Sequence, residues 1–112
     1  MLNKIINNAF STKMLQEDIL GDCINVEFQI ISEDEFRQAI KESSKIIIGH
    51  EDTAKFFGVE MNRETIQLHE GDVLFVCEAN AKHGGRLPSG TEFLEQMGTD
   101  FFFRFFRICV KS

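Results

Sequence analysis

The chain has 112 residues, of which 43% are hydrophobic and 27% are charged, values typical of one soluble globular domain. Its net charge of −6 argues against general binding of long DNA or RNA, which requires a basic surface that displaces counterions. No apolar run approaches the roughly 20 residues that span a bilayer, and no signal peptide is visible. We therefore expect a single domain over residues 1–112 that resides in the cytoplasm and does not bind membranes.

The first half of the chain begins with a short apolar run, residues 2–6, which predicts a strand. The polar stretch that follows, residues 7–15, favours a turn because Asn and Ser side chains bond to nearby backbone. Apolar and polar side chains alternate over residues 24–31, which predicts a strand with one buried face. That buried face would consist of Ile24, Val26, Phe28 and Ile30.

The middle of the chain alternates between helical and strand patterns. Residues 32–44 open with serine and have glutamate three positions later, the spacing of a capping box, and they predict a helix. Residues 45–48 are a lysine followed by three isoleucines, and this apolar run is typical of a strand covered on both faces. Residues 51–57 predict a short helix, with Gly58 suited to the position that ends it.

The last third combines a predicted hairpin, a long loop and a Phe-rich strand. Residues 63–79 predict two strands joined by a turn at residues 70–72. Residues 80–90 form a loop, residues 91–97 a short helix, and residues 101–110 a central strand that is apolar on both faces. Together these elements predict an α/β fold, in which short helices flank a mixed sheet of five or six strands.

Several kinds of site have no motif in this sequence. The three cysteines, Cys23, Cys77 and Cys109, are far apart and match no zinc-binding spacing, so we expect buried free thiols in a reducing compartment. No carboxylate cluster suggests magnesium, and neither a glycine-rich phosphate loop nor a nucleophilic serine motif is present. We therefore expect no metal, no cofactor and no protein nucleophile.

His50 follows a glycine at the end of the strand expected at residues 45–48 and precedes a helix. Ligands of open α/β sheets bind beyond the carboxyl ends of strands, and a helix N-terminus offers free N–H groups to an anion. Glu51 and Asp52 would repel a nearby phosphate, so we interpret them as helix-capping acids that point away from any ligand. The local pattern leaves two roles open for His50, an acid–base group at a phosphate site or a polar turn residue.

Two further segments carry candidate ligand contacts. Arg86 lies between glycines in the sequence GGRLPSG, and its guanidinium can pair with phosphate, although an exposed loop arginine is the alternative. Asn8 and Ser11 can donate hydrogen bonds to a nucleotide, or they can simply close the first turn. Lys82 and His83 are weaker candidates, and we expect His69 to be a surface residue.

Without a metal or a protein nucleophile, one compatible reaction uses a nucleophile that the substrate carries. The ribose 2′-hydroxyl of an RNA-like substrate can attack the adjacent phosphorus and expel the 5′-oxygen. One histidine can protonate that oxygen and one arginine can stabilise the developing charge. This chemistry would suit a site that contains His50 and Arg86.

Four segments, in their order and spacing, resemble the small viral ring nucleases, the type III anti-CRISPR family. They are NNAFSTKML (7–15), IGHEDTAKFFG (48–58), MNRETIQL (61–68) and RLPSG (86–90). The resemblance covers roughly residues 4–110. It implies a homodimer that binds cyclic tetra-adenylate across its interface and cuts it without a metal. The products would be linear di-adenylates with 2′,3′-cyclic phosphate ends, and their formation would suppress type III CRISPR signalling.

The same resemblance implies roles for particular residues. It makes His50 the principal catalytic residue and Arg86 a phosphate contact or transition-state stabiliser. The implied ligand-pocket residues are Asn8, Ala9, Phe10, Ser11 and Gly49. One position departs from the family pattern, because Ser89 follows Arg-Leu-Pro where many members have an acidic residue. This departure supports an alternative, a non-catalytic sponge or sensor of cyclic oligonucleotides; a protein-interaction module of a mobile element is a further alternative.

Overall fold

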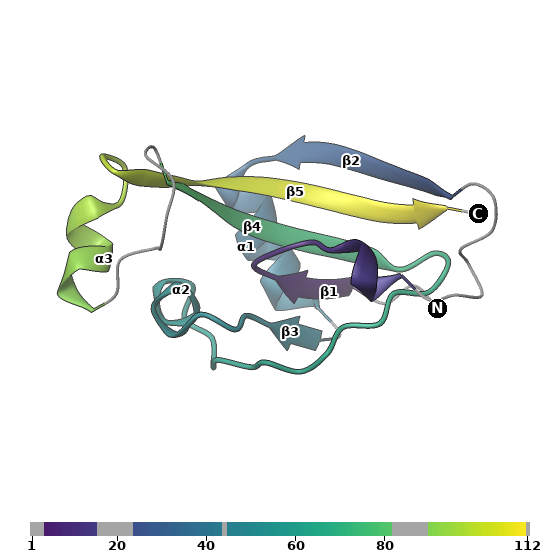
Figure 1. Cartoon of the computed structure of the whole chain (residues 1–112), viewed down its shortest axis with the longest axis horizontal. Coiled ribbons are helices and arrows are strands. Elements are labelled where there is room, and N and C mark those ends of the chain that lie inside the picture. The colour runs from purple at the N-terminus through teal and green to yellow at the C-terminus, as the bar shows by residue number, and fades with distance from the viewer. Residues whose placement is uncertain (1–3, 16–23, 44, 82–89, 112) are drawn as a thin grey trace.

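The computed structural model describes residues 4–15, 24–43, 45–81 and 90–111. Within them the chain folds into one five-stranded sheet with the strand order β2-β5-β4-β1-β3 (Figure 1). The strands are β1 (Lys4–Asn7), β2 (Asn25–Ile31), β3 (Lys45–Ile47), β4 (Val73–Ala81) and β5 (Phe101–Lys111). β1 pairs in parallel with β3 and β4, whereas β5 pairs antiparallel with β2 and β4. The expected mixed α/β sheet is thereby confirmed.

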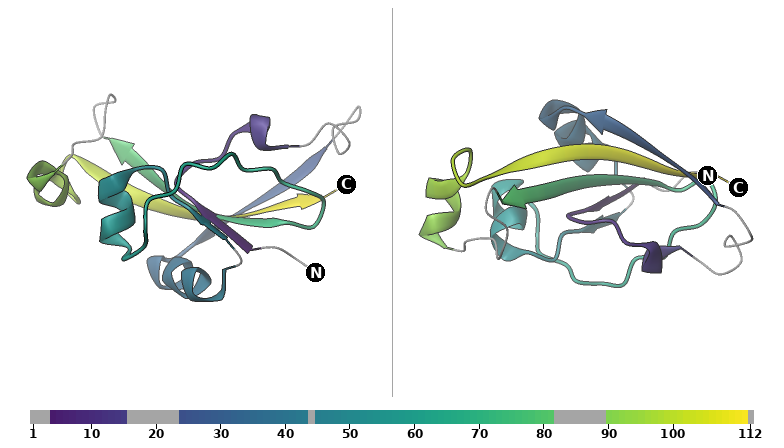
Figure 2. Two further views of the ribbon diagram at one scale, coloured as in Figure 1. Left: turned by 90° about the horizontal axis from the view of Figure 1, so that it is seen from below. Right: turned by 45° about the horizontal axis from the view of Figure 1, so that its top comes forward.

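Short helices connect the strands and cover the sheet. They are the 3₁₀ helix η1 (Thr12–Met14) and the α-helices α1 (Glu33–Glu42), α2 (Glu51–Phe56) and α3 (Thr91–Gln96). Figure 2 shows α1 on one face of the sheet, and η1 with the segment between α2 and β4 on the other. In the described residues, no helix is long and apolar enough to cross a membrane.

Local sequence signals explain where α1 begins and where α2 ends. Ser32 and Glu35 form the predicted capping box, in which the Ser32 hydroxyl accepts from the Glu35 backbone N–H at 3.1 Å. Gly58 follows α2 with φ of 72°, a conformation that costs glycine little and other residues more. Both predictions are confirmed.

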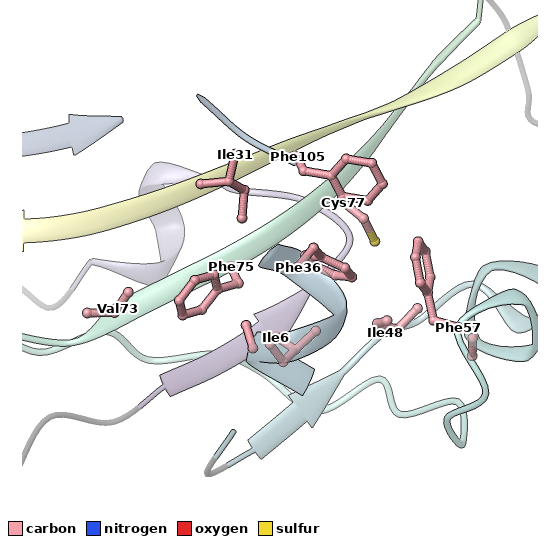
Figure 3. Close-up of a cluster of buried hydrophobic side chains, with 11 residues drawn as sticks. Ile6, Ile31, Phe36, Ile48, Phe57, Val73, Phe75, Cys77 and Phe105 are labelled. Carbon is pink, nitrogen blue, oxygen red and sulfur yellow. The ribbon is translucent and has the colours of Figure 1, made fainter. Parts of the chain in front are cut away.

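The core has one cluster of apolar side chains on each face of the sheet. The α1 face gathers Ile6, Phe36, Phe75 and Phe105, together with Ile48 and Phe57 from around α2 (Figure 3). The opposite face gathers side chains of β1, β3, β4 and β5 under Leu15, Ile66 and Leu68. The Phe-rich β5 contributes to both clusters, as a strand apolar on both faces should.

The predicted buried face of β2 is wrong in part. Phe28 is 57% exposed and Ile30 is 81% exposed, although both lie in the predicted strand. β2 is the outermost strand beside β5, and of its own residues only Val26 packs against the cluster on that face. Phe28 and Ile30 therefore stay largely exposed on this face of β2.

The hairpin predicted at residues 63–79 is also wrong, because only its second strand forms, as β4. β1 and β5 occupy the two edges of β4, which leaves no edge for the residues before it. Those residues instead make a single bridge, Leu68 with Leu15. Asp72 then closes the turn into β4, since its Oδ2 accepts from the His69 backbone N–H at 2.8 Å. His69 itself is exposed, as expected.

Two of the three cysteines lie in the described residues. Cys77 is a buried free thiol, as predicted, and Cys109 is free but half-buried. Burial raises the pKa of the Cys77 thiol to about 12, which makes it an unreactive core residue at neutral pH. Cys23 lies outside the described residues.

Candidate functional site

The carboxyl ends of β1 and β3 bring two distant motifs together. The two strands run parallel, with Asn7 opposite Ile47, so that the residues after them meet at one edge of the sheet. The Gly49 backbone N–H donates to Asn8 Oδ1 at 3.3 Å. The NNAFS segment and the IGH segment are therefore in direct contact.

The NNAFS segment is held by its own polar side chains. The buried Asn7 donates from Nδ2 to the Ala9 carbonyl at 2.6 Å. Ser11 Oγ accepts from the Lys13 backbone N–H at 3.2 Å and caps η1. Ser11 thus closes the turn, and because its oxygen is the acceptor there, its hydroxyl proton can still be donated to a ligand.

His50 is the N-terminal cap of α2 and directly follows Ile48 and Gly49. Its Nδ1 accepts from the Thr53 backbone N–H at 3.2 Å and lies 2.9 Å from Thr53 Oγ1. Thr53 is buried, so the imidazole is anchored to a fixed part of the helix. With Nδ1 engaged as an acceptor, the proton of the neutral ring lies on Nε2.

The acidic residues beside His50 have partners of their own. The prediction that Asp52 caps α2 is wrong, because His50 is the cap. The Asp52 Oδ2 instead accepts from the Gly90 backbone N–H at 3.0 Å. Glu51 pairs with Lys55 at 3.3 Å along the helix. These contacts show that both carboxylates have roles within the fold, and that Asp52 ties the start of α3 to α2.

α3 also meets the His50 ring directly. The centroids of His50 and the buried Phe93 are 5.6 Å apart, with 33° between the ring planes. The imidazole is therefore supported on one side by an apolar ring and at Nδ1 by Thr53. Such a fixed orientation is what a positioned acid–base group requires.

A cavity of about 350 Å³ opens between the segments that follow β1 and β3, and His50 is not among the residues that line it. Three of the predicted ligand-binding residues, Asn8, Ser11 and Gly49, line it. Ala9 and Phe10 do not; Ala9 is exposed, and the Phe10 ring packs edge-on against Phe28 at 5.6 Å. The structure thus brings three of the five predicted ligand-binding residues to one cavity.

Arg63 is a lining residue that the sequence reasoning did not single out. Its Nε donates to the Gly49 carbonyl at 3.0 Å, and Lys13 lines the same cavity. The third charged residue there, Glu64, is neutralised in part by Lys45, which lowers the pKa of the Glu64 carboxyl. The one signal for Arg63 in the sequence is its place in the MNRETIQL segment, one of the four that carry the family resemblance.

Residues 4–98 match the profile of the STIV B116-like family. The chain belongs to this family. It is also similar in structure to B116 of Sulfolobus turreted icosahedral virus, with a TM-score of 0.64 and 19% sequence identity over 96% of this chain and 98% of that one. At this identity the likeness establishes a shared fold. No curated protein matches the chain.

The family match covers the site residues that the structure describes and also candidate residues outside the described ranges. Asn8, Ser11, Gly49, His50 and Arg63 all fall within residues 4–98. Arg86, Ser89, Lys82 and His83 do so too, but they lie outside the described residues.

Chemically, the cavity offers two cationic side chains and several hydrogen-bond donors, and the fixed imidazole of His50 follows its lining residue Gly49 in the sequence. Arginine and lysine favour anions such as phosphate. Asn and Ser side chains suit the polar edges of a nucleotide. The arrangement therefore fits a small anionic ligand better than a long nucleic acid, for which the acidic chain is unsuited.

Proposed function

We propose that this protein is a metal-independent ring nuclease that cleaves cyclic tetra-adenylate into linear di-adenylates with 2′,3′-cyclic phosphate ends. The observation that carries the proposal is the orientation of His50, whose Nδ1 is held by Thr53, and its place in the sequence directly after Gly49, a residue that lines a cavity together with Lys13 and Arg63. The membership of the STIV B116-like family is consistent with it. In a host cytoplasm, this activity would suppress type III CRISPR signalling.

The reaction uses the substrate's own nucleophile. A ribose 2′-oxygen bonds to the adjacent phosphorus while the bond from phosphorus to the 5′-oxygen breaks. The 2′-hydroxyl proton passes to solvent, and the departing 5′-oxygen takes a proton from His50 Nε2. A positioned general acid contributes roughly 10²–10⁴-fold in rate.

Thr53 suits both protonation states of this histidine. In the neutral ring, Nδ1 accepts from the Thr53 N–H, which leaves the proton on Nε2. In the cationic ring, Nδ1 becomes a donor, and Thr53 Oγ1 at 2.9 Å is placed to accept from it. The same residue can therefore orient the imidazole before and after proton transfer.

Arg63 and Lys13 in the cavity, together with Arg86, would bind the phosphates. An Arg63 guanidinium anchored through Nε keeps its two terminal nitrogens for a ligand, since in the described residues no hydrogen bond or ion pair uses them. Fixed cations of this kind stabilise charge that develops on phosphorus oxygens. Asn8 and Ser11 would contact the nucleotide beside them.

We further propose that the ring binds across the interface of a homodimer. A fourfold-repetitive ring on a twofold axis presents equivalent phosphates to both subunits. Two His50 residues would then cut two opposite bonds and give two di-adenylates.

A second candidate, sequestration of the ring without cleavage, is favoured by Ser89 in place of an acidic residue. The experiment that separates the two incubates the protein with an excess of labelled cyclic tetra-adenylate in EDTA, denatures it, and identifies the released nucleotide. Linear di-adenylate in excess of the protein supports catalysis. Intact ring recovered in full contradicts catalysis and supports sequestration.

A further inference from the structure

Asp52 binds α3 at the residue where that helix begins. Its Oδ2 accepts from the backbone N–H of Gly90, the N-cap residue of α3, at 3.0 Å. A negative charge at this end of a helix interacts favourably with the helix dipole. α3 has only six residues, too few for a helix to be stable without tertiary contacts. Its place in the fold therefore depends on contacts such as the one with Asp52.

The buried Phe93 of α3 links β5 to the imidazole of His50. The centroid of its ring lies 5.0 Å from that of Phe101 in β5 and 5.6 Å from that of His50. Phe93 is only 1% exposed, and α3 lies beyond the end of the sheet at which β5 begins (Figure 1). The position of α3 therefore sets the position of the apolar ring that His50 contacts.

Thr53 and Phe93 restrain the His50 ring in different ways. Thr53 holds Nδ1, but a hydrogen bond tolerates bending of about 30°, and a tilt of that size about Nδ1 would move Nε2 by roughly 1 Å. A misplacement of this size can lower a reaction rate by about 100-fold. Phe93, whose ring plane is 33° from that of the imidazole, limits the tilt on the face that it covers. Both contacts are therefore needed to fix Nε2.

We infer that Asp52 is a positioning residue for His50. By holding Gly90 it keeps α3 in place, and α3 keeps Phe93 against the imidazole. Asp52 is not among the described residues that line the cavity of the candidate site, so its carboxylate would act through α3 and would not contact the substrate. The inference rests on the proposed role of His50 as the general acid, and it adds a residue on which the placement of Nε2 depends.

The kinetic test compares the wild type with Asp52→Ala and Asp52→Asn. Asparagine keeps an oxygen that can accept from the Gly90 N–H, whereas alanine does not. We expect Asp52→Ala to lower kcat for cyclic tetra-adenylate about tenfold and to leave KM within about twofold of the wild-type value, because ligand contacts are unchanged. Asp52→Asn should retain most of kcat. Thermal unfolding checks that each variant is folded at the assay temperature.

Glu51→Gln is the matched control for charge. It removes a carboxylate from the same first turn of α2, but one that pairs with Lys55 along the helix and not with α3. We expect its kcat to equal that of the wild type. If Asp52→Asn is as slow as Asp52→Ala, or if Glu51→Gln is equally slow, the effect is due to charge and not to the contact with α3, and the inference is overturned.

Nuclear magnetic resonance tests the positioning without substrate. An aromatic ring shifts the resonances of protons near its face, so the Hδ2 and Hε1 resonances of His50 report where Phe93 lies. Phe93→Leu gives the shifts expected when the ring is absent. We expect Asp52→Ala to move the His50 resonances toward those of Phe93→Leu, and Asp52→Asn and Glu51→Gln to keep the wild-type values.

The two readouts separate this inference from the proposed function. Unchanged His50 resonances in a folded Asp52→Ala variant would contradict the positioning role, whatever the turnover. The expected changes in the resonances, together with a wild type that leaves the ring intact, would support the link from Asp52 to His50 and contradict only the nuclease function.

Discussion

Nδ1 of His50 lies 2.9 Å from Thr53 Oγ1 and accepts from the Thr53 backbone N–H at 3.2 Å. This relationship makes His50 both the cap of α2 and an oriented imidazole. It also distinguishes a positioned catalytic group from a polar turn residue in terms that can be measured. The turn role requires only the backbone N–H, whereas the catalytic role also uses the hydroxyl.

We predict that Thr53→Val lowers the turnover of cyclic tetra-adenylate by about tenfold or more. Valine keeps the backbone N–H and the shape of threonine but removes the oxygen that, in the proposed mechanism, would accept from a cationic His50, and a hydrogen bond to a charged group contributes roughly 1.5–3 kcal/mol. Thr53→Ser should restore most of the turnover. The measurement is the rate under saturating ring, with thermal unfolding as the check on stability. Equal rates for valine and serine would show that the hydroxyl has no part in the reaction.

Arg63→Ala should weaken binding of cyclic tetra-adenylate by roughly 10- to 100-fold, because one charge-assisted contact to phosphate is lost. The affinity of the variant should also depend less steeply on salt. Lys41→Ala is the matched control, since Lys41 is an exposed cation on α1, away from the cavity. Isothermal titration with an uncleavable ring or with the His50→Ala background gives the affinities. An affinity equal to that of the control would exclude Arg63 from the ligand site.

Gly49→Ala should also reduce the affinity for the ring, but for a geometric reason. A Cβ at this position would lie 3.3 Å from Arg63 Cγ, so the arginine side chain must shift to accommodate it. The hydrogen bond from Arg63 Nε to the Gly49 carbonyl, now 3.0 Å long, would then be weakened. We expect the effects of Gly49→Ala and Arg63→Ala on affinity to be non-additive in a double-mutant cycle. Additive losses would mean that the two residues act independently.

The buried thiol of Cys77 should be almost inert in the native protein. Its pKa is raised to about 12 by burial, so at pH 8 the thiolate is about one part in ten thousand. With Cys23 and Cys109 replaced by serine, a thiol reagent should react with Cys77 only after denaturant unfolds the chain. Rapid reaction under native conditions would contradict the burial of this residue.

Phe36→Ala should destabilise the fold by about 3–5 kcal/mol, the usual cost of removing a buried phenyl ring. Phe36 is fully buried between α1 and the sheet, 5.2 Å from Phe105 between ring centroids. Leu94→Ala, an exposed apolar truncation on α3, should change the free energy of unfolding by less than about 0.5 kcal/mol. Urea unfolding compares the two variants, and similar midpoints would show that the cluster around Phe36 is not a principal core.

Local signals in the sequence predicted most of the elements. The Ser32 and Glu35 capping box and Gly58 at the end of α2 depend on backbone geometry within a few residues, so these signals could be identified from the sequence alone. The position of His50 after a strand and before a helix was predictable for the same reason. Its role as the helix cap was not, because Asp52 is a more common capping residue, and Asp52 instead accepts from Gly90.

The features that the sequence did not predict depend on neighbours that are distant in the chain. Alternation along β2 indicates an apolar face, but whether Phe28 and Ile30 are covered depends on how far other segments extend over the sheet. The residues before β4 were mistaken for a strand because β1, far earlier in the sequence, takes the edge that they would need. Arg63 enters the site through a hydrogen bond to Gly49, 14 residues away, which no local pattern reveals.

The most direct test of the central proposal is chromatography of cyclic tetra-adenylate after incubation in EDTA with wild type, His50→Ala or His69→Ala. His69 is an exposed histidine that does not line the cavity of the candidate site, so its variant controls for loss of an imidazole elsewhere. We predict linear di-adenylate with 2′,3′-cyclic phosphate ends from the wild type and from His69→Ala, and intact ring from His50→Ala. Equal product from His50→Ala and wild type would contradict the assigned role of His50, and intact ring from the wild type would contradict the nuclease function itself.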